Sequence, residues 1–309
     1  MRIVITLGGN ALLRRGQPMT AEAQAENIRK ASLSLKRTAT RHQLILSHGN
    51  GPQVGLLALQ NDAFSRSVEP YPLSILGAES QAMVGTLLEQ EIRNALPGHP
   101  VACIITHSVV SPDDPAFENP VKFIGPVYDK ETAESLAAEK GWIVRPDGPH
   151  YRRVVPSPRP VRIVEIEAIR RLVEAGITVI CAGGGGVPVV VDGEGRLSGI
   201  EAVIDKDFCS EILASELHAD MLVIATDVPG VFLNWHSPDE KHVRRASPEH
   251  LRALKFAAGS MGPKVEAACE FVEKTGRCAA IGSLNDIEAL VEARAGTIVD
   301  RNCREIEFA

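Results

Sequence analysis

The sequence predicts an α/β protein with an open, mainly parallel sheet sandwiched between helices and a small protruding subdomain. Two observations support this prediction. Short apolar runs alternate with helical patterns over most of the chain, which is typical of a parallel sheet covered on both faces. Glycine-rich turns also stand where an apolar run ends or a helical pattern begins, and open α/β sheets bind ligands at such turns.

The N-terminal third of the chain predicts strand–turn–helix units. The first strand ends in a turn at 8–11, where glycines let the backbone approach a ligand closely. The second ends at 48–51, and a turn that leads into a helix can bind an anion through its backbone N–H groups. We expect strands at 2–7, 43–47 and 101–106, and helices capped by Thr20, started by Pro52 and covering 73–96.

The composition changes between residues 111 and 160, which hold nine of the twenty prolines and a short helical pattern at 132–140. This composition predicts that the segment leaves the sheet and forms a protruding excursion. It is either a lid or small subdomain with a function, or a rigid surface insertion without one, and composition does not decide between them.

Strands and helices alternate again in the second half of the chain. We expect a hairpin between 187–191 and 202–204. A helix follows from Asp207, whose side chain suits an N-cap, and Lys206 therefore stands between two acids at a turn-to-helix junction. On its own, the charged run at 205–207 would indicate only a solvated loop. We also expect helices at 165–175, 248–254, after Gly262 and at 286–293, and strands at 177–182, 221–225, 278–281 and 296–299.

Composition limits the classes of partner. The chain has 309 residues and a net charge of -6, so no overall basic field indicates nucleic acid. Its six cysteines form no CxxC, and the histidines form no HExxH, which favours a reduced cytoplasmic protein without structural zinc. The N-terminus shows no signal-peptide pattern, and four glycines and Pro188 interrupt the longest apolar run, at 177–191. We expect no membrane partner.

The remaining features favour phosphoryl transfer. A Walker A loop, the dinucleotide-binding GxGxxG, the protein-kinase motifs and a GxSxG elbow are all absent. The chain instead combines glycine-rich turns with Lys206 and Lys264 in turn-to-helix settings and with Lys122 inside the proline-rich segment. One lysine about 4 Å from a phosphate oxygen contributes on the order of 4 kcal/mol at an effective dielectric near 20. Several such lysines would neutralise much of the charge in a transferred phosphoryl group.

Seven segments, in this order, give the chain a resemblance to the carbamate kinases of the amino-acid kinase superfamily. The resemblance covers essentially the full length, and the segment at 119–126 separates these enzymes from their sister kinases. The segments are LGGNAL at 7–12, SHGNGPQVG at 47–55, NPVKFIGP at 119–126, VVPSP at 154–158, CAGGGGVP at 181–188, EAVIDKD at 201–207 and GSMGPK at 259–264.

The resemblance implies an amino-acid kinase fold and a homodimer that makes ATP from ADP and carbamoyl phosphate, or runs the reverse reaction. Magnesium is expected to bind with the nucleotide, and no protein residue is assigned to hold a metal. Residues 1–219 would form a carbamate- and phosphoryl-binding part that includes the protruding segment 111–160. Residues 220–309 would form a nucleotide-binding part.

The resemblance also implies roles for individual residues. Lys206 and Lys264 would contact phosphate oxygens, Asp207 would orient them, and Lys122 would reach in from the protruding subdomain. The turns that would face carbamate and the transferred group contain Gly8, Gly9, Asn10, His48, Gly49, Asn50 and Gly51. The nucleotide side would contain Thr226, Asp227 and Met261, besides Lys206 and Lys264.

No general base stands out among these residues. Carbamate is already an anion near neutral pH, so its repulsion from a polyphosphate is the main obstacle, and lysines and backbone donors address it. We interpret His48 as a turn-stabilising residue rather than a proton-transfer group. Two alternatives remain: another kinase of the superfamily, against which the Lys122 segment argues, and a non-catalytic nucleotide- or anion-binding regulator, which would need no converging lysines.

Overall fold

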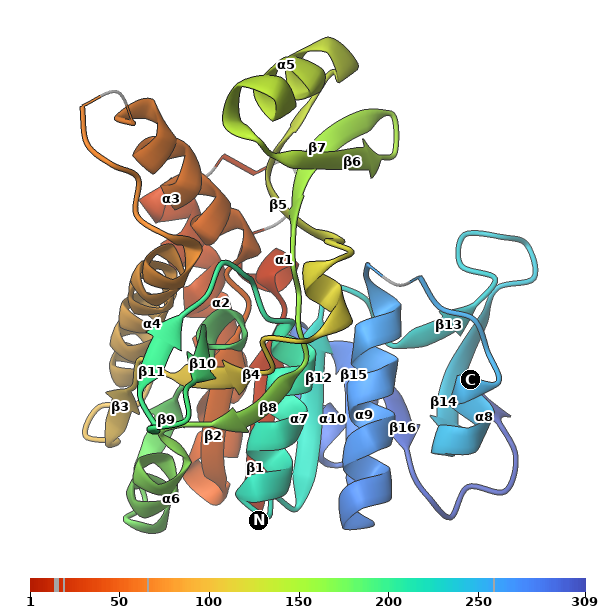
Figure 1. Ribbon diagram of the computed structural model, residues 1–309. Helices are drawn as coiled ribbons and strands as arrows, with labels where there is room; N and C mark the ends of the chain where they lie inside the picture. Colours follow the sequence, from red (N-terminus) through yellow and green to blue (C-terminus); the bar gives the residue numbers. More distant parts are fainter. Residues whose placement is uncertain (14–16, 19, 66, 258) are drawn as a thin grey trace.

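A computed structural model describes residues 1–13, 17–18, 20–65, 67–257 and 259–309, with Asn10 and Ala11 described by their backbone alone. A large sheet forms the centre of the molecule (Figure 1). Its strand order is β13-β14-β16-β15-β12-β1-β2-β9-β3, and β17 pairs with β14. The strands are β1 (Arg2–Leu7), β2 (Gln43–His48), β3 (Val101–Cys103), β9 (Thr178–Ile180), β12 (Met221–Thr226), β13 (Val231–Leu233), β14 (Lys241–Ala246), β15 (Cys278–Ser283), β16 (Thr297–Val299) and β17 (Glu307–Phe308).

Helices cover both faces of this sheet, which confirms the predicted sandwich. Alternate residues of β1 point to opposite faces: Val4 joins one apolar core and Ile3 and Ile5 join the other. The first core receives helices α6, α7 and α9, and the second receives α2, α4 and α10. The helices are α1 (Gly9–Leu12), α2 (Ala21–Arg41), α3 (Gly51–Ala63), α4 (Leu73–Ala95), α5 (Lys130–Lys140), α6 (Ile166–Glu174), α7 (Lys206–Glu216), α8 (Pro248–Arg252), α9 (Met261–Thr275) and α10 (Ile287–Val291).

The strands in the middle of the sheet are parallel, as predicted. The strands from the C-terminal part of the chain, at one edge of the sheet, pair both in parallel and antiparallel. Strand β1 pairs in parallel with both β2 and β12, while β15 with β16 and β13 with β14 run antiparallel. Strands β13 and β14 were not predicted, because β14 carries Lys241, His242, Arg244 and Arg245 instead of an apolar run. Since β12 pairs with β1, the two predicted parts of the chain share one sheet.

A second sheet corrects two of the predicted strands. Only the first half of the predicted strand at 101–106 forms a strand, β3, and residues 104–106 form none. The next strand, β4 (His107–Val110), belongs to the second sheet. In the predicted hairpin, β10 (Val187–Val191) pairs with β11 (Leu197–Gly199), and residues 202–204 form no strand. The Val203 N–H instead donates to the carbonyl of Pro156, far away in the sequence. The order of this sheet is β11-β10-β4-β8, with β8 at Pro160–Ile163.

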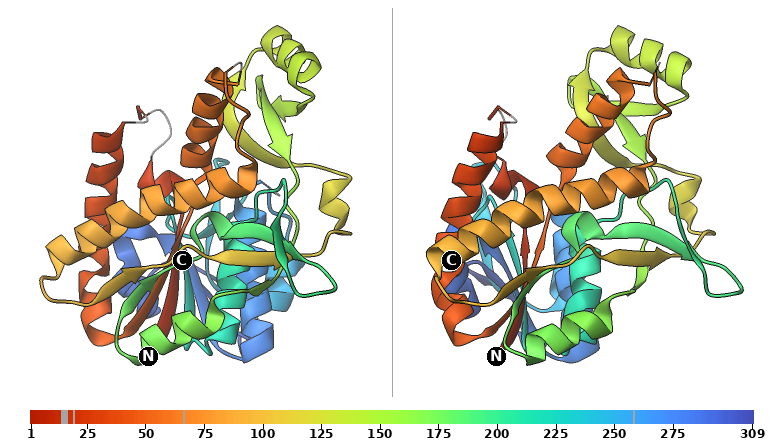
Figure 2. Two further views of the ribbon diagram at one scale, coloured as in Figure 1. Left: turned by 60° about the vertical axis from the view of Figure 1, so that its left-hand side comes forward. Right: turned by 90° about the vertical axis from the view of Figure 1, so that its left-hand side faces the viewer.

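The proline-rich excursion forms the predicted protruding subdomain. It is a small sheet of order β5-β7-β6 with α5 beside it, and it stands clear of the central sheet beyond the carboxyl end of β1 (Figures 1 and 2). Its base touches α3, where a Cβ added to Gly55 would lie 2.7 Å from the Cα of Gly125. Its closure over a ligand stays a prediction. The strands are β5 (Lys122–Tyr128), β6 (Ile143–Asp147) and β7 (His150–Val155).

In the part of the chain that the structure describes, no helix is both long enough and apolar enough to span a membrane.

Candidate active site

The predicted glycine turns meet at the carboxyl ends of β1, β2 and β12. The Gly8 N–H donates to the carbonyl of Ala225 at 2.8 Å, and the Gly49 N–H donates to that of Leu7 at 2.8 Å. A Cβ added to Gly49 would lie 2.7 Å from the backbone nitrogen of Gly9. Only glycine at position 49 therefore allows the two turns to approach this closely.

Helix α7 begins beside these turns, and its N-cap stands two residues earlier than predicted. Its N-cap is Asp205, which has an extended backbone, and the Asp205 Oδ1 accepts a hydrogen bond from the Asp207 N–H at 3.0 Å. The prediction that Asp207 caps the helix is therefore wrong. Because Asp205 caps the helix, the side chain of Asp207, which is 2% exposed, is free to face the site.

Asp207 brings Lys206 and Lys264 together. The Lys206 Nζ lies 2.5 Å from Asp207 Oδ1 and also donates to the hydroxyl of Thr6 at 3.2 Å. The Lys264 Nζ, in the first turn of α9, lies 2.9 Å from Asp207 Oδ2. Both carboxylate oxygens of Asp207 therefore hold an ammonium group, and the structure places these three residues together as predicted.

Lys122 approaches the same place from the subdomain. Its Nζ donates to Asp205 Oδ2 at 2.6 Å, while the other oxygen of Asp205 caps α7. Three lysines from separate elements thus gather around two acids that flank Lys206 in the sequence. We call Lys122, Lys206, Lys264, Asp205 and Asp207 the lysine cluster.

Burial and charge act against each other in the lysine cluster. Burial would raise the pKa of Asp207, but the adjacent Lys206 and Lys264 hold that pKa well below its usual range. Burial lowers the pKa of Lys206, and Asp207 opposes that change. For Lys264 the attraction of Asp207 outweighs burial, and the pKa is raised. The cluster therefore keeps an ionised carboxylate at the point where its lysines converge.

His48 is packed inside the turn rather than aimed at a substrate. It is 1% exposed, and its Nδ1 lies 3.2 Å from the Gly49 carbonyl oxygen. A Cβ added to Gly183 would lie 2.5 Å from the His48 ring. Burial lowers the pKa of His48 to about 4, so the imidazole is neutral at pH 7. These contacts support the turn-stabilising interpretation.

The buried neutral His48 predicts a loss of stability in weak acid. The folded-state pKa of about 4 lies below the ordinary value of 6.5, so between these values the unfolded chain binds a proton that the folded chain does not. The free energy of unfolding should fall by up to about 3 kcal/mol as the pH falls through this window. Urea unfolding of the wild type and of His48→Gln measures it. The variant should show the shallower dependence between about pH 5 and pH 6.5; equal slopes would contradict the prediction.

Asn50 is buried behind the turn, and it makes a hydrogen bond to a residue that the sequence did not indicate. Its Nδ2 donates to the Ser80 hydroxyl of α4 at 2.6 Å, and Asn50 is 6% exposed. A Cβ added to Gly184 would lie 2.1 Å from this amide, so the tetraglycine turn packs around Asn50. Gly51 is the first residue of α3. The predicted contact of the Asn10 side chain lies outside the described residues.

The residues predicted for the nucleotide lie on the C-terminal side of the lysine cluster. Thr226 ends β12, and its hydroxyl donates to Asp227 Oδ1 at 3.1 Å. A Cβ added to Gly8 would lie 3.8 Å from the Thr226 hydroxyl oxygen. Met261 begins α9, one turn before Lys264. The strand end of β12 and the start of α9 therefore border the glycine turns and the lysines.

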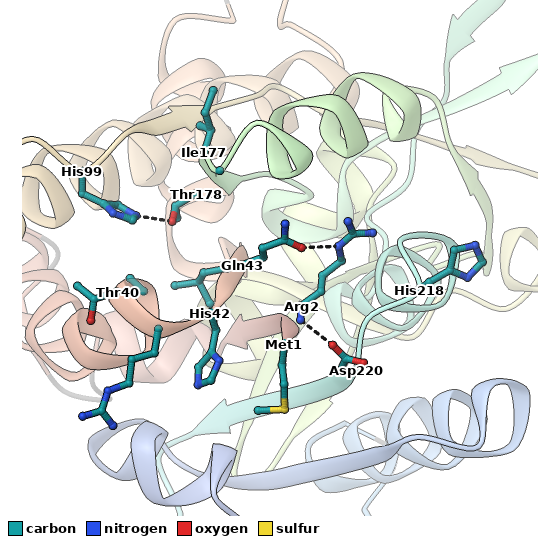
Figure 3. A pocket seen from close by; sticks show the side chains of 14 residues that line it. Met1, Arg2, Thr40, His42, Gln43, His99, Ile177, Thr178, His218 and Asp220 are labelled. Atoms are coloured by element: carbon teal, nitrogen blue, oxygen red, sulfur yellow. Dashed lines mark hydrogen bonds between the residues drawn. The ribbon is translucent and has the colours of Figure 1, made fainter.

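A cavity of about 580 Å³ lies elsewhere, at the amino ends of β1 and β2. Figure 3 shows its lining, in which Arg2 donates to Gln43 and Asp220, and His99 meets Thr178. These polar groups satisfy one another, and none of the predicted site residues lines the cavity. We place the active site at the opposite edge of the sheet, where the lysines and glycine turns converge.

Metal-ligating side chains do not gather in the described ranges, which contain no group of three or more His, Cys, Asp or Glu residues that could hold a metal ion. The carboxylate oxygens of Asp207 both contact ammonium groups. Few carboxylate oxygens are therefore free to bind a metal ion here, which suits a cation whose ligands are mostly phosphate oxygens of a bound nucleotide.

The chain is similar to known proteins over nearly its full length. Residues 1–283 match the model of the amino acid kinase family. The carbamate kinase of Rhizobium meliloti (strain 1021) is 52% identical, with 100% of this chain and 96% of the relative covered. The carbamate kinase of Pyrococcus horikoshii is 45% identical, with coverage of 96% and 98%. The solved carbamate kinase from Giardia lamblia bound to AMP-PNP is 37% identical, covers 97% of this chain and 98% of its own, and has a TM-score of 0.89.

Proposed function

The chain belongs to the amino acid kinase family, and from this premise we propose that it catalyses reversible phosphoryl transfer between ATP and carbamate, which yields ADP and carbamoyl phosphate. The observation that carries the proposal is the lysine cluster, in which three ammonium groups from separate elements meet beside two glycine turns. Full-length identity of about one half to carbamate kinases selects the acceptor within the family.

The proposed reaction needs charge neutralisation and no proton transfer. An oxygen of carbamate forms a bond to the γ-phosphorus of ATP, and the bond from that phosphorus to the bridging oxygen of ADP breaks with its electron pair. Lys206 and Lys264 are proposed to leave Asp207 partly and bind the oxygens of the transferred group, while Asp207 keeps them oriented. Burial lowers the pKa of His48 to about 4 and keeps its ring away from a substrate, so His48 is a weak base that the reaction does not need.

The glycine turns are proposed to supply backbone donors. Gly8, Gly9 and Gly49 leave no side chain between the backbone and the lysine cluster. The N–H groups of Gly8 and Gly49 donate to the carbonyls of Ala225 and Leu7 and hold the two turns in place. The N–H of Gly9 is therefore the proposed donor to the phosphoryl group. Gly51 begins α3, whose N-terminal dipole favours an anion. Asn50 is held by Ser80 and fixes the shape of the turn between Gly49 and Gly51.

Magnesium is proposed to come with the nucleotide. The phosphates of ATP or ADP would supply most of its oxygen ligands, and the nearby carboxylates are Asp205, Asp207 and Asp227. The ion would neutralise phosphate charge, which adds to the effect of the lysines.

Three further features are proposals that rest on the family resemblance. We propose that the protein is a homodimer, that it works in the cytoplasm, and that it takes part in arginine metabolism. The nucleotide would bind the part from residue 220 onwards, where Thr226, Asp227 and Met261 lie.

A coupled assay for ATP formation from carbamoyl phosphate and ADP tests the proposed function. The protein should make ATP with this donor, and in the reverse direction it should phosphorylate carbamate in preference to amino-acid carboxylates and nucleoside monophosphates. A kinase of another specificity would prefer one of the other acceptors. A regulator would bind nucleotide and turn over none of them.

Lys122 should affect the carbamoyl side of the reaction selectively. Its ammonium group reaches Asp205 from the first residue of β5, in a separate small sheet, whereas the nucleotide is proposed to bind near α9. Lys122→Ala should lower kcat/KM for carbamoyl phosphate by about 10- to 100-fold and leave ADP affinity nearly unchanged. Lys122→Arg should rescue poorly, because a planar guanidinium does not reproduce a compact ammonium.

Steady-state kinetics and calorimetric ADP titration of both variants measure this effect. Lys130→Ala is the matched control, because Lys130 is an exposed lysine of the same subdomain whose ion pair is with Glu134. Loss of mainly ADP affinity, or unchanged carbamoyl phosphate kinetics, would show that Lys122 does not reach the substrate.

A further inference from the structure

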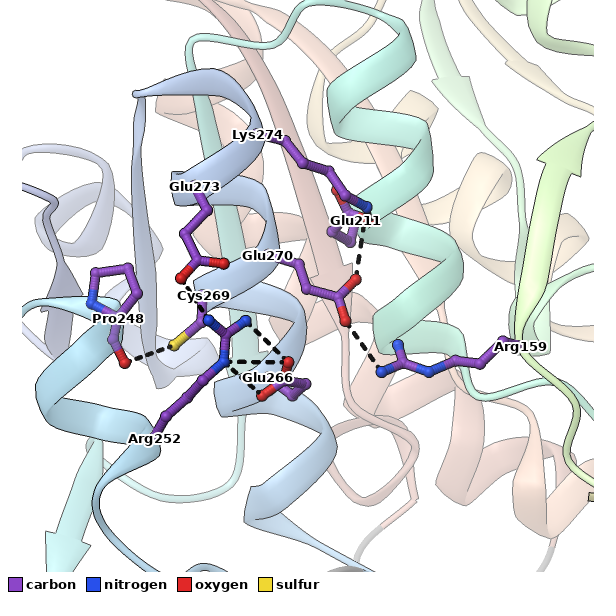
Figure 4. A network of polar contacts seen from close by, with 9 residues as sticks. All are labelled: Arg159, Glu211, Pro248, Arg252, Glu266, Cys269, Glu270, Glu273 and Lys274. Carbon is purple, nitrogen blue, oxygen red and sulfur yellow. Dashed lines mark hydrogen bonds and ion pairs between the residues drawn. The ribbon is translucent and has the colours of Figure 1, made fainter. Parts of the chain in front are cut away.

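Arg159 joins the base of the subdomain to the two helices that carry Lys206 and Lys264. It lies on the return segment between β7 and β8. Its guanidinium carbon stands 3.4 Å from the centre of the Phe208 ring in α7. Its Nη2 lies 3.0 Å from Glu270 Oε1 in α9 (Figure 4). Its backbone N–H donates to Asp114 Oδ2, on the segment that leads out to the subdomain, at 2.9 Å.

The elements that surround Arg159 carry the three lysines of the active site. Phe208 follows Lys206 and Asp207 in the first turn of α7. Glu270 belongs to α9, which carries Lys264 in its first turn. The return segment continues from β7, whose Val155 is paired with Lys122 of β5. Arg159 thus contacts the helix of Lys206 and the helix of Lys264, and it is connected to the strand pair of Lys122.

Glu270 is itself held in place on the side of α9 that faces α7. Lys274 lies 3.5 Å from Glu270 and 2.7 Å from Glu211 of α7, which is 1% exposed. Figure 4 shows this chain of contacts running from Arg159 across α9 to α7. Arg159 therefore meets a carboxylate whose position is fixed by both helices.

We propose that Arg159 is a positioning residue that holds the base of the subdomain against α7 and α9 and so sets the place of the Lys122 ammonium group. This inference rests on the proposed function. Arg159 does not touch the reacting atoms, and its ion pair with Glu270 is partly exposed, so it adds little to global stability. Its effect is on the position of the Lys122 ammonium group, because a small displacement of a charged group in an active site strongly lowers what that group contributes to catalysis.

Arg252 provides a matched control, because it also pairs with glutamates of α9. It pairs with Glu266 and Glu273 of α9, with exposure similar to that of Arg159, but it comes from α8. Figure 4 shows the two arginines meeting different glutamates of α9. Arg252→Ala removes comparable ion pairs and leaves the base of the subdomain intact.

Kinetics on Arg159→Ala and Arg252→Ala test the proposal. Arg159→Ala should raise KM for carbamoyl phosphate about three- to tenfold, with KM for ADP and kcat changed less than about twofold. Arg252→Ala should change neither KM. Glu270→Gln removes the charge at nearly constant shape and should shift the same KM in the same direction. Equal effects of the two arginine variants, or equal changes in both KM values, would overturn the proposal.

Hydrogen exchange supplies a readout that does not depend on activity. The Val203 N–H donates to the Pro156 carbonyl at 3.0 Å and ties the return segment to the loop before α7. In the ligand-free protein this amide should exchange about three- to tenfold faster in Arg159→Ala than in Arg252→Ala. Equal exchange would refute the positioning role even in an active enzyme. A wild type that makes no ATP would instead refute the proposed function and leave the exchange test in force.

Discussion

Replacing either Lys206 or Lys264 by alanine should lower kcat roughly 30- to 1000-fold, which corresponds to a loss of about 2–4 kcal/mol of transition-state stabilisation. Both ammonium groups converge on Asp207 within 3 Å, so each stands where charge on a transferred phosphoryl group would develop. Removing one lysine leaves Asp207 paired with the other. The free energy of unfolding should therefore fall less than it would if the only partner of a buried carboxylate were removed.

Single-turnover kinetics and thermal unfolding of both variants measure the two effects separately. Arg245→Ala is the control, because its ion pair with Asp300, at 2.8 Å, is also partly buried but lies on β14, away from the lysine cluster. The control should unfold at a somewhat lower temperature and keep its kcat. If Lys206→Ala or Lys264→Ala turned over like the wild type, the assignment of the lysine cluster would fail.

Gly49→Ala should lower kcat by about 100-fold or more, although alanine adds only a methyl group. A Cβ at position 49 would lie 2.7 Å from the nitrogen and 3.0 Å from the Cα of Gly9, which are backbone atoms of the facing turn. The turns must separate to accept it, and a displacement of about 1 Å in an active site can cost two orders of magnitude in rate. The same turn contacts the Lys206 side chain, because the added Cβ would lie 3.5 Å from its Cδ.

Gly193→Ala is the matched control for this variant. Gly193 lies in the turn between β10 and β11, where an added Cβ meets nothing within 4 Å. Its kinetics and unfolding temperature should be those of the wild type. A Gly49→Ala enzyme with normal kcat would mean that the backbone of these turns does not hold the phosphoryl group.

The sequence pattern places Lys206 and Lys264 at one edge of the sheet, whereas the resemblance alone implied that Lys122 joins them. Lys206 and Lys264 lie at the starts of helices, and the glycine turns end strands, so a parallel sheet brings all of them to one edge. The role of Asp205 was not predictable in the same way. Asp205 and Asp207 both suit an N-cap, and only the extended backbone of Asp205 shows which of them caps α7.

Contacts between distant segments account for the other differences. Residues 202–204 are apolar enough for a strand, but Val203 donates to Pro156 of the return segment, which no local pattern reveals. Arg159 gave no signal in the sequence either. It is an arginine among prolines, and its importance comes from Phe208 and Glu270, which lie on two helices that the fold brings beside it.

The central claim, transfer of a phosphoryl group between carbamoyl phosphate and ADP, is tested most directly by phosphorus NMR of a mixture of the protein, carbamoyl phosphate, ADP and magnesium. The carbamoyl phosphate resonance should disappear as the γ-phosphate resonance of ATP grows by an equal amount, and Lys206→Ala should slow both changes together. Conversion of carbamoyl phosphate to inorganic phosphate without ATP, or no reaction while ADP still binds, would contradict the claim.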